Sequence, residues 1–279
     1  MSLPRPEDWE STAAWLEVGA PIGDGRWDLV AAHVSGRTGD GLVERAVLLG
    51  MAVAVVGERA SGHHGSPVPE GAGPGVTVRD VGPGDAVFDA RRLAVVDLSS
   101  LWAGPLAGSV LARAGARVVK VESTTRPDAA RAGPPSLFRS LNAGKASVTL
   151  DFGSSSGMRE LRDLVARSDV VITSARPRAL EQLGLDPAAS VAGGGPAVWL
   201  AVTGYGDGPG SADRVAFGDD AAAAGGLVVW DAEGPCFCAD ALADPATGLA
   251  GAATVLELLA SGRRAVVTAS MADIAGALL

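Results

Sequence analysis

The sequence predicts an α/β fold, an open and mostly parallel sheet with helices on both faces. From residue 91 onward, short apolar runs alternate with segments of helical periodicity. Aromatic residues make up only 4% of the chain, whereas glycine occurs 38 times, which suits close packing of small side chains between helices and a sheet. The run 93–97, a helix at 106–114 and the run 117–122 are typical of a β-α-β unit, and such sheets bind ligands in the turn after the first strand.

The first 58 residues are expected to form a separate segment of helices and one strand. Apolar periodicity predicts helices at 7–18, 27–34 and 41–49 and a strand at 51–56. Residues 59–90 are rich in Gly and Pro, show no periodicity, and are interpreted as a linker that contains a solvated His63 and His64.

The core domain is expected to span 91–279. Strands are predicted at 93–97, 117–122, 169–173, 197–203, 226–230 and 264–270, and helices at 106–114, 153–168, 177–183, 219–224, 244–260 and 271–279. Alternation of this kind favours parallel pairing with right-handed helical crossovers.

Composition disfavours several classes of partner. The net charge is -9 and no basic stripe occurs, which disfavours nucleic acid. No apolar stretch is long enough to span a bilayer and no signal peptide is evident, so we expect a cytoplasmic protein with no membrane partner. Cys236 and Cys238 are too few ligands for a metal site, so no metal is expected and both are interpreted as buried free thiols.

Common site motifs are absent. The turn after the first core strand lacks G-x-G-x-x-G, and no G-x-x-x-x-G-K-[ST] occurs, which excludes dinucleotide-binding and P-loop sites. Residues 91–279 contain no histidine, which excludes a Ser-His-Asp hydrolase in this core.

A series of short motifs nevertheless occurs in a defined order. They are VDLSSLWAGP at 96–105, GARVVKVE at 115–122, RPD at 126–128 with Arg131, Phe138 with LNAGKASVTLD at 141–151, DVVITSARPRALEQLGL at 169–185, TGYGDGP at 203–209, DPATG at 244–248 and SMAD at 270–273. Together they resemble the class III CoA-transferase family, which includes carnitine CoA-transferases, formyl-CoA transferases and 2-methylacyl-CoA racemases. The resemblance implies a Rossmann-like large domain and an interlocked homodimer.

The resemblance also implies a permuted order. Family members continue past the Ser-Met-x-Asp segment through a small domain and a closing stretch. Residues 27–56 resemble that closing stretch, so the chain is expected to be a short, permuted member in which much of the small domain is absent.

The resemblance implies a carboxylate nucleophile at Asp244. It would attack an acyl-CoA and form a mixed anhydride, then an aspartyl-CoA thioester that an acceptor carboxylic acid resolves. Coenzyme A is then a substrate, and no permanently bound cofactor is expected. On the residues alone, Asp244 before Pro245 is equally an ordinary N-cap, and the helix N-terminus is expected to keep it ionised near neutral pH. Asp240 is a competing candidate that lacks the following Thr-Gly.

The resemblance also suggests which residues contact CoA. Ser100, Leu101, Trp102 and Ala103 are expected along the pantetheine, and Lys145, Arg131, Arg176 and Arg178 are candidate phosphate contacts. Gly204, Gly206 and Gly208 are candidates for bringing backbone N–H groups to an oxyanion. The competing interpretations are a core role for Trp102 and solvated surface positions for the cations.

Departures from the family pattern leave two alternatives. The family's usual Asn is lost in 173–178, and Gln182 replaces a usual Arg. Asp219 stands where racemases carry a catalytic His, which disfavours a His/Asp pair. The alternatives are an acyl-CoA racemase-like enzyme that uses Asp244 as a base, and a non-catalytic member that binds CoA weakly.

Overall fold

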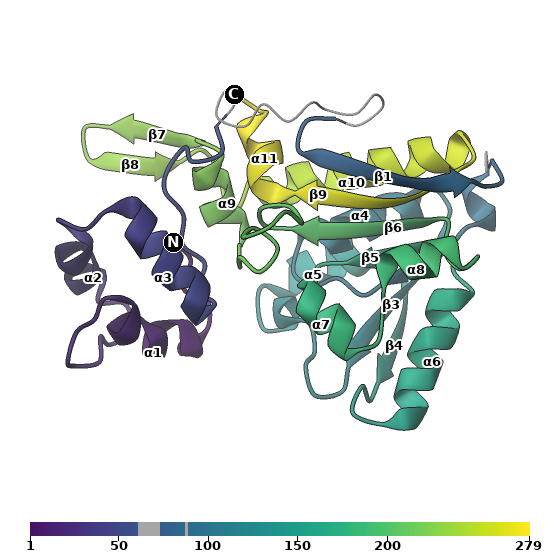
Figure 1. Cartoon of the computed structure of the whole chain (residues 1–279), viewed down its shortest axis with the longest axis horizontal. Coiled ribbons are helices and arrows are strands. Elements are labelled where there is room, and N and C mark those ends of the chain that lie inside the picture. Colours follow the sequence, from purple (N-terminus) through teal and green to yellow (C-terminus); the bar gives the residue numbers. More distant parts are fainter. Residues whose placement is uncertain (61–72, 87–88) are drawn as a thin grey trace.

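A seven-stranded sheet forms the body of the computed structural model, which describes residues 1–60, 73–86 and 89–279 (Figure 1). Its strand order is β1-β9-β6-β5-β2-β3-β4, and β1 is antiparallel to β9 whereas the other pairs are parallel. The strands are β1 (Val76–Pro83), β2 (Ala94–Asp97), β3 (Arg117–Ser123), β4 (Ala146–Leu150), β5 (Val170–Thr173), β6 (Val198–Thr203) and β9 (Arg263–Ser270). The predicted α/β class is confirmed.

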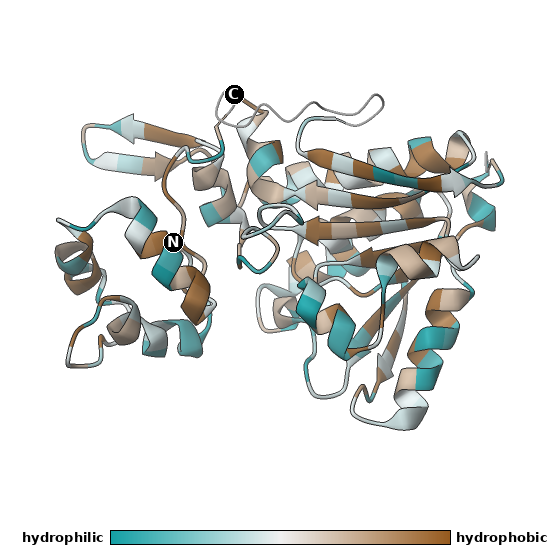
Figure 2. Ribbon diagram, viewed as in Figure 1, coloured by the Kyte–Doolittle hydropathy of each residue, from teal (hydrophilic) through white to brown (hydrophobic). Residues whose placement is uncertain are grey.

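Helices cover both faces of this sheet. Because successive side chains of a strand point to opposite faces, Val95 belongs to one core cluster and Val96 to another. The first cluster packs under α4 (Ala103–Arg113) and α10 (Ala243–Ala260), and the second under α6 (Ser155–Ala166), α7 (Pro177–Gln182) and α8 (Pro187–Ala192). Hydrophobic colour runs along the strands in Figure 2, while α6 carries hydrophilic residues on its outer side.

The remaining elements of the body lie in the connections between strands or after the last strand, β9. They are the 3₁₀ turns η1 (Ala90–Arg92) and η2 (Ala129–Arg131) and the helices α5 (Pro135–Asn142), α9 (Gly218–Ala224) and α11 (Met271–Gly276). One of these helices follows directly on a strand: α11 begins where β9 ends, and its Ser270 N-cap hydroxyl accepts from the Asp273 N–H at 3.4 Å.

Three helices at the N-terminus form a small unit beside the sheet (Figure 1). They are α1 (Pro6–Trp15), α2 (Trp27–Val34) and α3 (Gly39–Leu49), and they share a core of their own around Trp15, Leu16 and Leu42. The predicted strand at 51–56 is wrong: the segment makes only the isolated bridge Ser2–Ala52, because its apolar side chains pack against the helices instead of a neighbouring strand.

The linker interpretation of 59–90 is wrong for Val76–Pro83, which forms the edge strand β1. Its partner is β9, with Val76 opposite Ala269 and Val78 opposite Val267. An edge strand needs a ladder on one side only, and Pro83, which has no N–H, is tolerated at its end. His63 and His64 lie outside the described residues, and the division into three regions stays a prediction.

The predicted strand at 226–230 exists, but it forms a hairpin instead of joining the main sheet. β7 (Val228–Asp231) pairs antiparallel with β8 (Gly234–Phe237), a strand that periodicity did not predict. Cys236 and Cys238 lie on this hairpin and just beyond it, and both thiols are free and exposed. The prediction of buried thiols is therefore wrong, because the hairpin is not covered by the sheet or its helices.

Within the described ranges, no helix combines the length and apolar character needed to cross a bilayer. Over the same residues, no cluster of His, Cys, Asp and Glu side chains has a geometry that could hold a metal ion.

Candidate active site

The carboxyl ends of the parallel strands meet at one edge of the sheet, and the strand order reverses between β2 and β5. Open α/β sheets bind ligands in the crevice at such a reversal. Here the turn after β2 and the turn after β5 are tied together, since the Ser100 N–H donates to Ser174 Oγ at 3.0 Å. The 98–102 turn, which contains three of the four residues predicted to contact the pantetheine (Ser100, Leu101 and Trp102), therefore lies at the strand-order reversal.

The 98–102 turn is held in one conformation. Leu101 has a positive φ of 69°, and its N–H donates to Asp128 Oδ1 at 3.0 Å. Lys120 Nζ lies 2.8 Å from Asp128 Oδ2 and donates to the Ser99 carbonyl at 2.6 Å. A left-handed leucine costs about 1 to 2 kcal/mol, so these contacts offset strain at a place where strain is commonly functional.

Asp244 lies where two helix N-termini meet. It is in the first turn of α10, and its Oδ1 accepts from the N–H of Ala103, the first residue of α4, at 3.2 Å. Its Oδ2 packs against α9, because a Cβ atom on Gly218 would lie 2.1 Å from it. The N-cap interpretation is wrong, since the cap position of α10 is Leu242 and the Asp244 carboxylate contacts a different helix.

Burial raises the pKa of Asp244 from 3.8 to about 7. The Ala103 N–H lowers this pKa, whereas the charges of Asp220, Asp219 and Asp240 raise it further. This raised pKa opposes the expectation that the helix N-terminus keeps Asp244 ionised near neutral pH, because the loss of hydration outweighs the Ala103 hydrogen bond.

The neighbouring acidic residues have distinct roles. Asp220 is fully buried, its Oδ1 accepts from the Phe217 N–H at 2.9 Å, and burial raises its pKa to about 6. Asp219 Oδ1 accepts from the Ala241 N–H at 2.8 Å. Asp240, the competing nucleophile, is exposed, whereas Asp244 is half-buried.

Lys145 is not positioned to bind a phosphate. Its side chain is 1% exposed, and its Nζ contacts Asp97 Oδ2 at 2.8 Å, the Pro105 carbonyl at 2.7 Å and Asn142 Oδ1 at 3.1 Å. Burial lowers the pKa of Lys145, and the Asp97 carboxylate opposes that shift. The predicted phosphate contact is wrong: this lysine holds α4 and α5 against the end of β2.

The predicted arginines differ in how they are held. Arg131 is 45% exposed, pairs with Glu122 Oε2 at 2.5 Å, and stacks over Phe138 with its Cζ 4.3 Å from the ring centre. Arg178 lies exposed on α7. Arg176 lines a cleft of about 440 Å³ together with Arg126, which the sequence did not single out as a phosphate contact.

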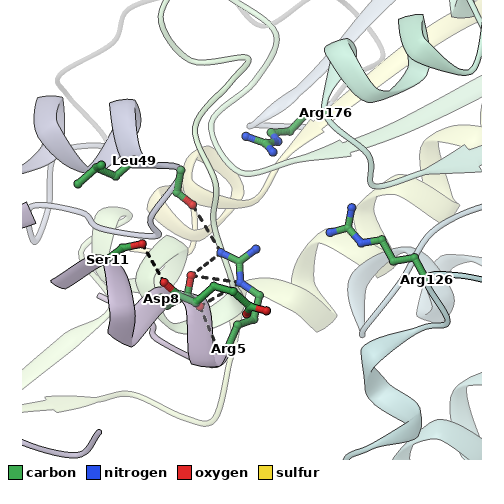
Figure 3. A pocket seen from close by; sticks show the side chains of 8 residues that line it. Arg5, Asp8, Ser11, Leu49, Arg126 and Arg176 are labelled. Atoms are coloured by element: carbon green, nitrogen blue, oxygen red, sulfur yellow. Dashed lines mark hydrogen bonds and ion pairs between the residues drawn. The ribbon is translucent and has the colours of Figure 1, made fainter. Parts of the chain in front are cut away.

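The cleft lies between the N-terminal unit and the sheet. Its walls are formed by Arg5, Glu7, Asp8, Ser11, Leu49, Gly50, Arg126 and Arg176. In Figure 3 the guanidinium groups of Arg126 and Arg176 extend into the cleft, whereas Arg5 is occupied by Asp8 on its own helix. Two cations therefore face a cavity without an acidic partner among the described residues.

The sequence profile of CoA-transferase family III matches residues 91–279. The chain belongs to this family. Among its relatives, the succinate–glutarate CoA-transferase of Agrobacterium fabrum is 33% identical over 125 residues, which cover 40% of this chain and 31% of that protein. The alpha subunit of the Chloroflexus aurantiacus succinyl-CoA–L-malate CoA-transferase is 31% identical over 163 residues, covering 54% of this chain and 36% of that protein.

Solved structures agree with this assignment. The crystal structure of Rv3272 from Mycobacterium tuberculosis superposes with a TM-score of 0.61 and 32% identity, over 72% of this chain and 56% of that chain. A CaiB/BaiF family protein from Brucella suis gives a TM-score of 0.60 and 29% identity, over 70% and 56% of the two chains. The family III chain thus spans about half the length of these structures and 23% to 36% of the curated relatives that it matches.

The glycine loop of this family III chain is mostly committed to packing. The Gly206 N–H donates to Thr203 Oγ1 at 3.0 Å and is not free to bind an oxyanion, so that prediction is wrong. The Gly204 carbonyl accepts from the Ala272 N–H at 3.0 Å, and a Cβ there would lie 2.6 Å from Ala216. An oxyanion role for Gly204 and Gly208 stays a prediction.

One part of the site was not evident from sequence, and one predicted residue has intermediate burial. Gly218 was not singled out, although its lack of a Cβ is what admits the Asp244 carboxylate. Trp102 is half-buried as the residue before α4, which fits neither a fully buried core aromatic nor a fully exposed one. A glycine directly before two aspartates is the signal that could have indicated the first of these.

Proposed function

We propose that this protein transfers CoA between carboxylic acids with Asp244 as the nucleophile. The observation that carries the proposal is a carboxylate enclosed between α4, α9 and α10, hydrogen-bonded to the residue that directly follows the turn at the strand-order reversal. Membership in CoA-transferase family III supports the class of reaction.

The proposed reaction begins with attack of the Asp244 carboxylate on the thioester carbonyl of acyl-CoA. The carbon–sulfur bond breaks, CoA leaves as a thiolate, and an acyl-aspartyl anhydride forms. The thiolate then attacks the aspartyl carbonyl and releases the donor acid as a carboxylate, which leaves an aspartyl-CoA thioester. The acceptor carboxylate repeats these steps in reverse order, so that a new acyl-CoA leaves and Asp244 is regenerated.

The surroundings of Asp244 suit this role. A carboxylate whose pKa is about 7 is more basic than an ordinary aspartate, and the same lack of hydration leaves it less shielded as a nucleophile. The Ala103 N–H, at the positive end of α4, donates to Asp244 Oδ1, and there it would stabilise the negative charge that develops when the thiolate attacks the aspartyl carbonyl.

For CoA itself, we propose that residues 100–103 contact the pantetheine and that Arg126 and Arg176 bind phosphate groups in the cleft. Arg131 and Arg178 are further candidates at the same edge of the sheet. We also propose a homodimer. The matched relatives are named for succinate, glutarate and malate, which supports a carboxylic acid as the acceptor.

Trapping with hydroxylamine tests the nucleophile. Incubation with an acyl-CoA and hydroxylamine is expected to convert Asp244 to a hydroxamate, located by mass spectrometry of the digested protein. Asp244→Asn is expected to lower the transfer rate by about a thousandfold or more, since the covalent route is lost. Asp240→Asn is the matched control, because Asp240 is exposed and is expected to change little.

Turnover that survives Asp244→Asn would overturn the proposal. An absence of CoA binding by calorimetry would instead favour a non-catalytic member.

One observation favours a second candidate activity, since a carboxylate with a pKa near 7 is well matched to general-base catalysis. A racemase-like reaction predicts exchange of the acyl α-hydrogen with D₂O in the absence of CoA exchange.

A further inference from the structure

We infer that Asp219 is a positioning residue that fixes the segment before α10 and thereby aims the Asp244 carboxylate. The inference deepens the proposed function. Its expected effect on kcat rests on that function, whereas its structural part does not. Its structural basis is a relay of hydrogen bonds from α9 to α10 through Ala241.

The relay passes through a strained residue. Asp219 Oδ1 accepts from the Ala241 N–H at 2.8 Å, and the Ala241 carbonyl accepts from the Asp244 N–H at 2.9 Å. Ala241 itself has a φ of 47°, in the left-handed region that residues with a Cβ avoid. Such a conformation persists only where its surroundings hold it, and the Asp219 carboxylate is the polar group that does so.

The contact between α9 and this segment is also sterically close. A Cβ on Gly218 would lie 2.5 Å from the Ala241 Cβ and 2.8 Å from the Ala241 carbonyl oxygen, in addition to its approach to Asp244. Two successive residues of α9 therefore act on the same target. Gly218 lets the carboxylate approach, and Asp219 fixes the chain that carries it.

The charge of Asp219 adds a second effect that can be separated from the hydrogen bond. The groups that act on Asp244 are Asp219 and Asp220 from α9, Asp240 from the preceding segment and the Ala103 N–H from α4. All three side chains are acidic, and none of the described basic groups is among the causes of the raised pKa of Asp244. Removing one negative charge is therefore expected to favour ionised Asp244.

Three substitutions separate these effects. Asp219→Asn keeps an oxygen that can accept from the Ala241 N–H but removes the negative charge. The rise of kcat with pH is therefore expected to begin at lower pH than in wild type, and the maximal kcat is expected to stay within about threefold of the wild-type value. Asp219→Ala removes both, and kcat is expected to fall by roughly tenfold or more at every pH while KM for acyl-CoA changes little. Asp240→Asn, the control, removes a charge that acts on Asp244 more weakly than that of Asp219 and makes no contact with Ala241, so its maximal kcat is expected to stay within about twofold of wild type.

A rescue variant tests the strained residue directly. Glycine adopts positive φ without penalty, so Ala241→Gly combined with Asp219→Ala is expected to recover part of the lost kcat. A positioning role predicts this recovery, whereas a role confined to charge or to direct contact with substrate does not.

Two measurements that need no turnover keep this inference distinct from the proposed function. Hydrogen exchange of the Ala241 amide is expected to be faster in Asp219→Ala than in wild type or Asp219→Asn. Carbon-13 NMR of the Asp244 carboxyl, assigned with Asp244→Asn, is expected to titrate at lower pH in Asp219→Asn. If Asp219→Ala matches Asp240→Asn in amide exchange, the inference is overturned even if wild type transfers CoA. If wild type transfers no CoA while both expected changes occur, the proposed function fails and the positioning role stands.

Discussion

Two groups of carboxylates at the same edge of the sheet differ in whether a cation compensates their charge. Asp97 and Asp128 each face a buried lysine at 2.8 Å, Lys145 and Lys120 respectively, and all four side chains are at most 2% exposed. Asp244 instead lies among other carboxylates, and burial raises its pKa to about 7. The edge therefore contains ion pairs on one side and a partly protonated carboxyl on the other.

The difference separates the carboxylates that hold the fold together from the one proposed as the nucleophile. A buried charge is costly unless it is paired, and the two ion pairs here hold the 98–102 turn through Ser99 and Leu101 and the start of α4 through Pro105. A carboxylate that loses hydration without gaining a cationic partner has a raised pKa, which is a frequent property of catalytic groups. Residue type alone does not distinguish the two, whereas the partner of each carboxylate does.

Breaking a buried pair is expected to have the largest effect. Lys120→Met removes the cation that faces Asp128 and the donor to the Ser99 carbonyl, and leaves a buried charge without a partner. We expect a loss of about 3 to 5 kcal/mol in the free energy of unfolding, measured by urea denaturation. Lys120→Met with Asp128→Asn is the matched control and is expected to recover part of the loss. A single variant as stable as wild type would contradict the scaffold role.

Removing the charge of Asp244, which has no cationic partner, is expected to raise the free energy of unfolding instead of lowering it. The pKa of Asp244 rises from 3.8 in the unfolded chain to about 7 in the folded one, so the folded state binds this proton more tightly. Both states are protonated below about pH 4, and the folded state loses stability as the pH rises from there to about 7. Asp244→Asn is therefore expected to match wild type near pH 4 and to exceed it by about 2 to 4 kcal/mol near pH 8.

The measurement is the free energy of unfolding of both proteins across this pH range. Asp240→Asn serves as the control, since its exposed carboxylate is expected to give no such pH dependence. A stability difference that is independent of pH would show that Asp244 is ionised over the whole range, and the contrast between the two groups of carboxylates would be lost.

Much of the fold could be predicted from sequence because periodicity reflects burial on both faces of a sheet. Strands such as Val170–Thr173 are continuous apolar runs, and their neighbours have clear helical periods. β1 was missed because an edge strand has one exposed side, and its sequence adjoins Gly- and Pro-rich residues. The segment 51–56 was taken as a strand because an apolar run alone does not reveal whether a pairing strand lies beside it.

Residues of the candidate site could be predicted from the sequence only where they lie within a short local motif. DPATG at 244–248 indicated Asp244, the proposed nucleophile, and the motif at 96–105 indicated the turn at the strand-order reversal. The role of Lys145 was not predictable because Asp97, its partner, lies 48 residues away and nothing local shows that the ammonium points inward. The Asp219–Ala241 contact spans 22 residues and depends on a positive φ, which no propensity of alanine indicates.

The smallest expected effect comes from the Arg131–Glu122 ion pair, which is paired like the lysine–aspartate pairs but is partly exposed to solvent. Arg131 holds the pKa of Glu122 at about 2, but its guanidinium is 45% exposed, so solvent screens the pair. Arg131→Ala is expected to cost about 1 kcal/mol at neutral pH. Because the folded-state pKa is depressed, this contribution is complete above about pH 4.5 and disappears as the pH falls toward 2. Arg131→Lys keeps a positive charge but loses the two parallel hydrogen bonds, so its free energy of unfolding is expected to lie between those of wild type and Arg131→Ala. Equal stability of the three proteins at pH 7 would show that the ion pair with Glu122 does not stabilise the fold.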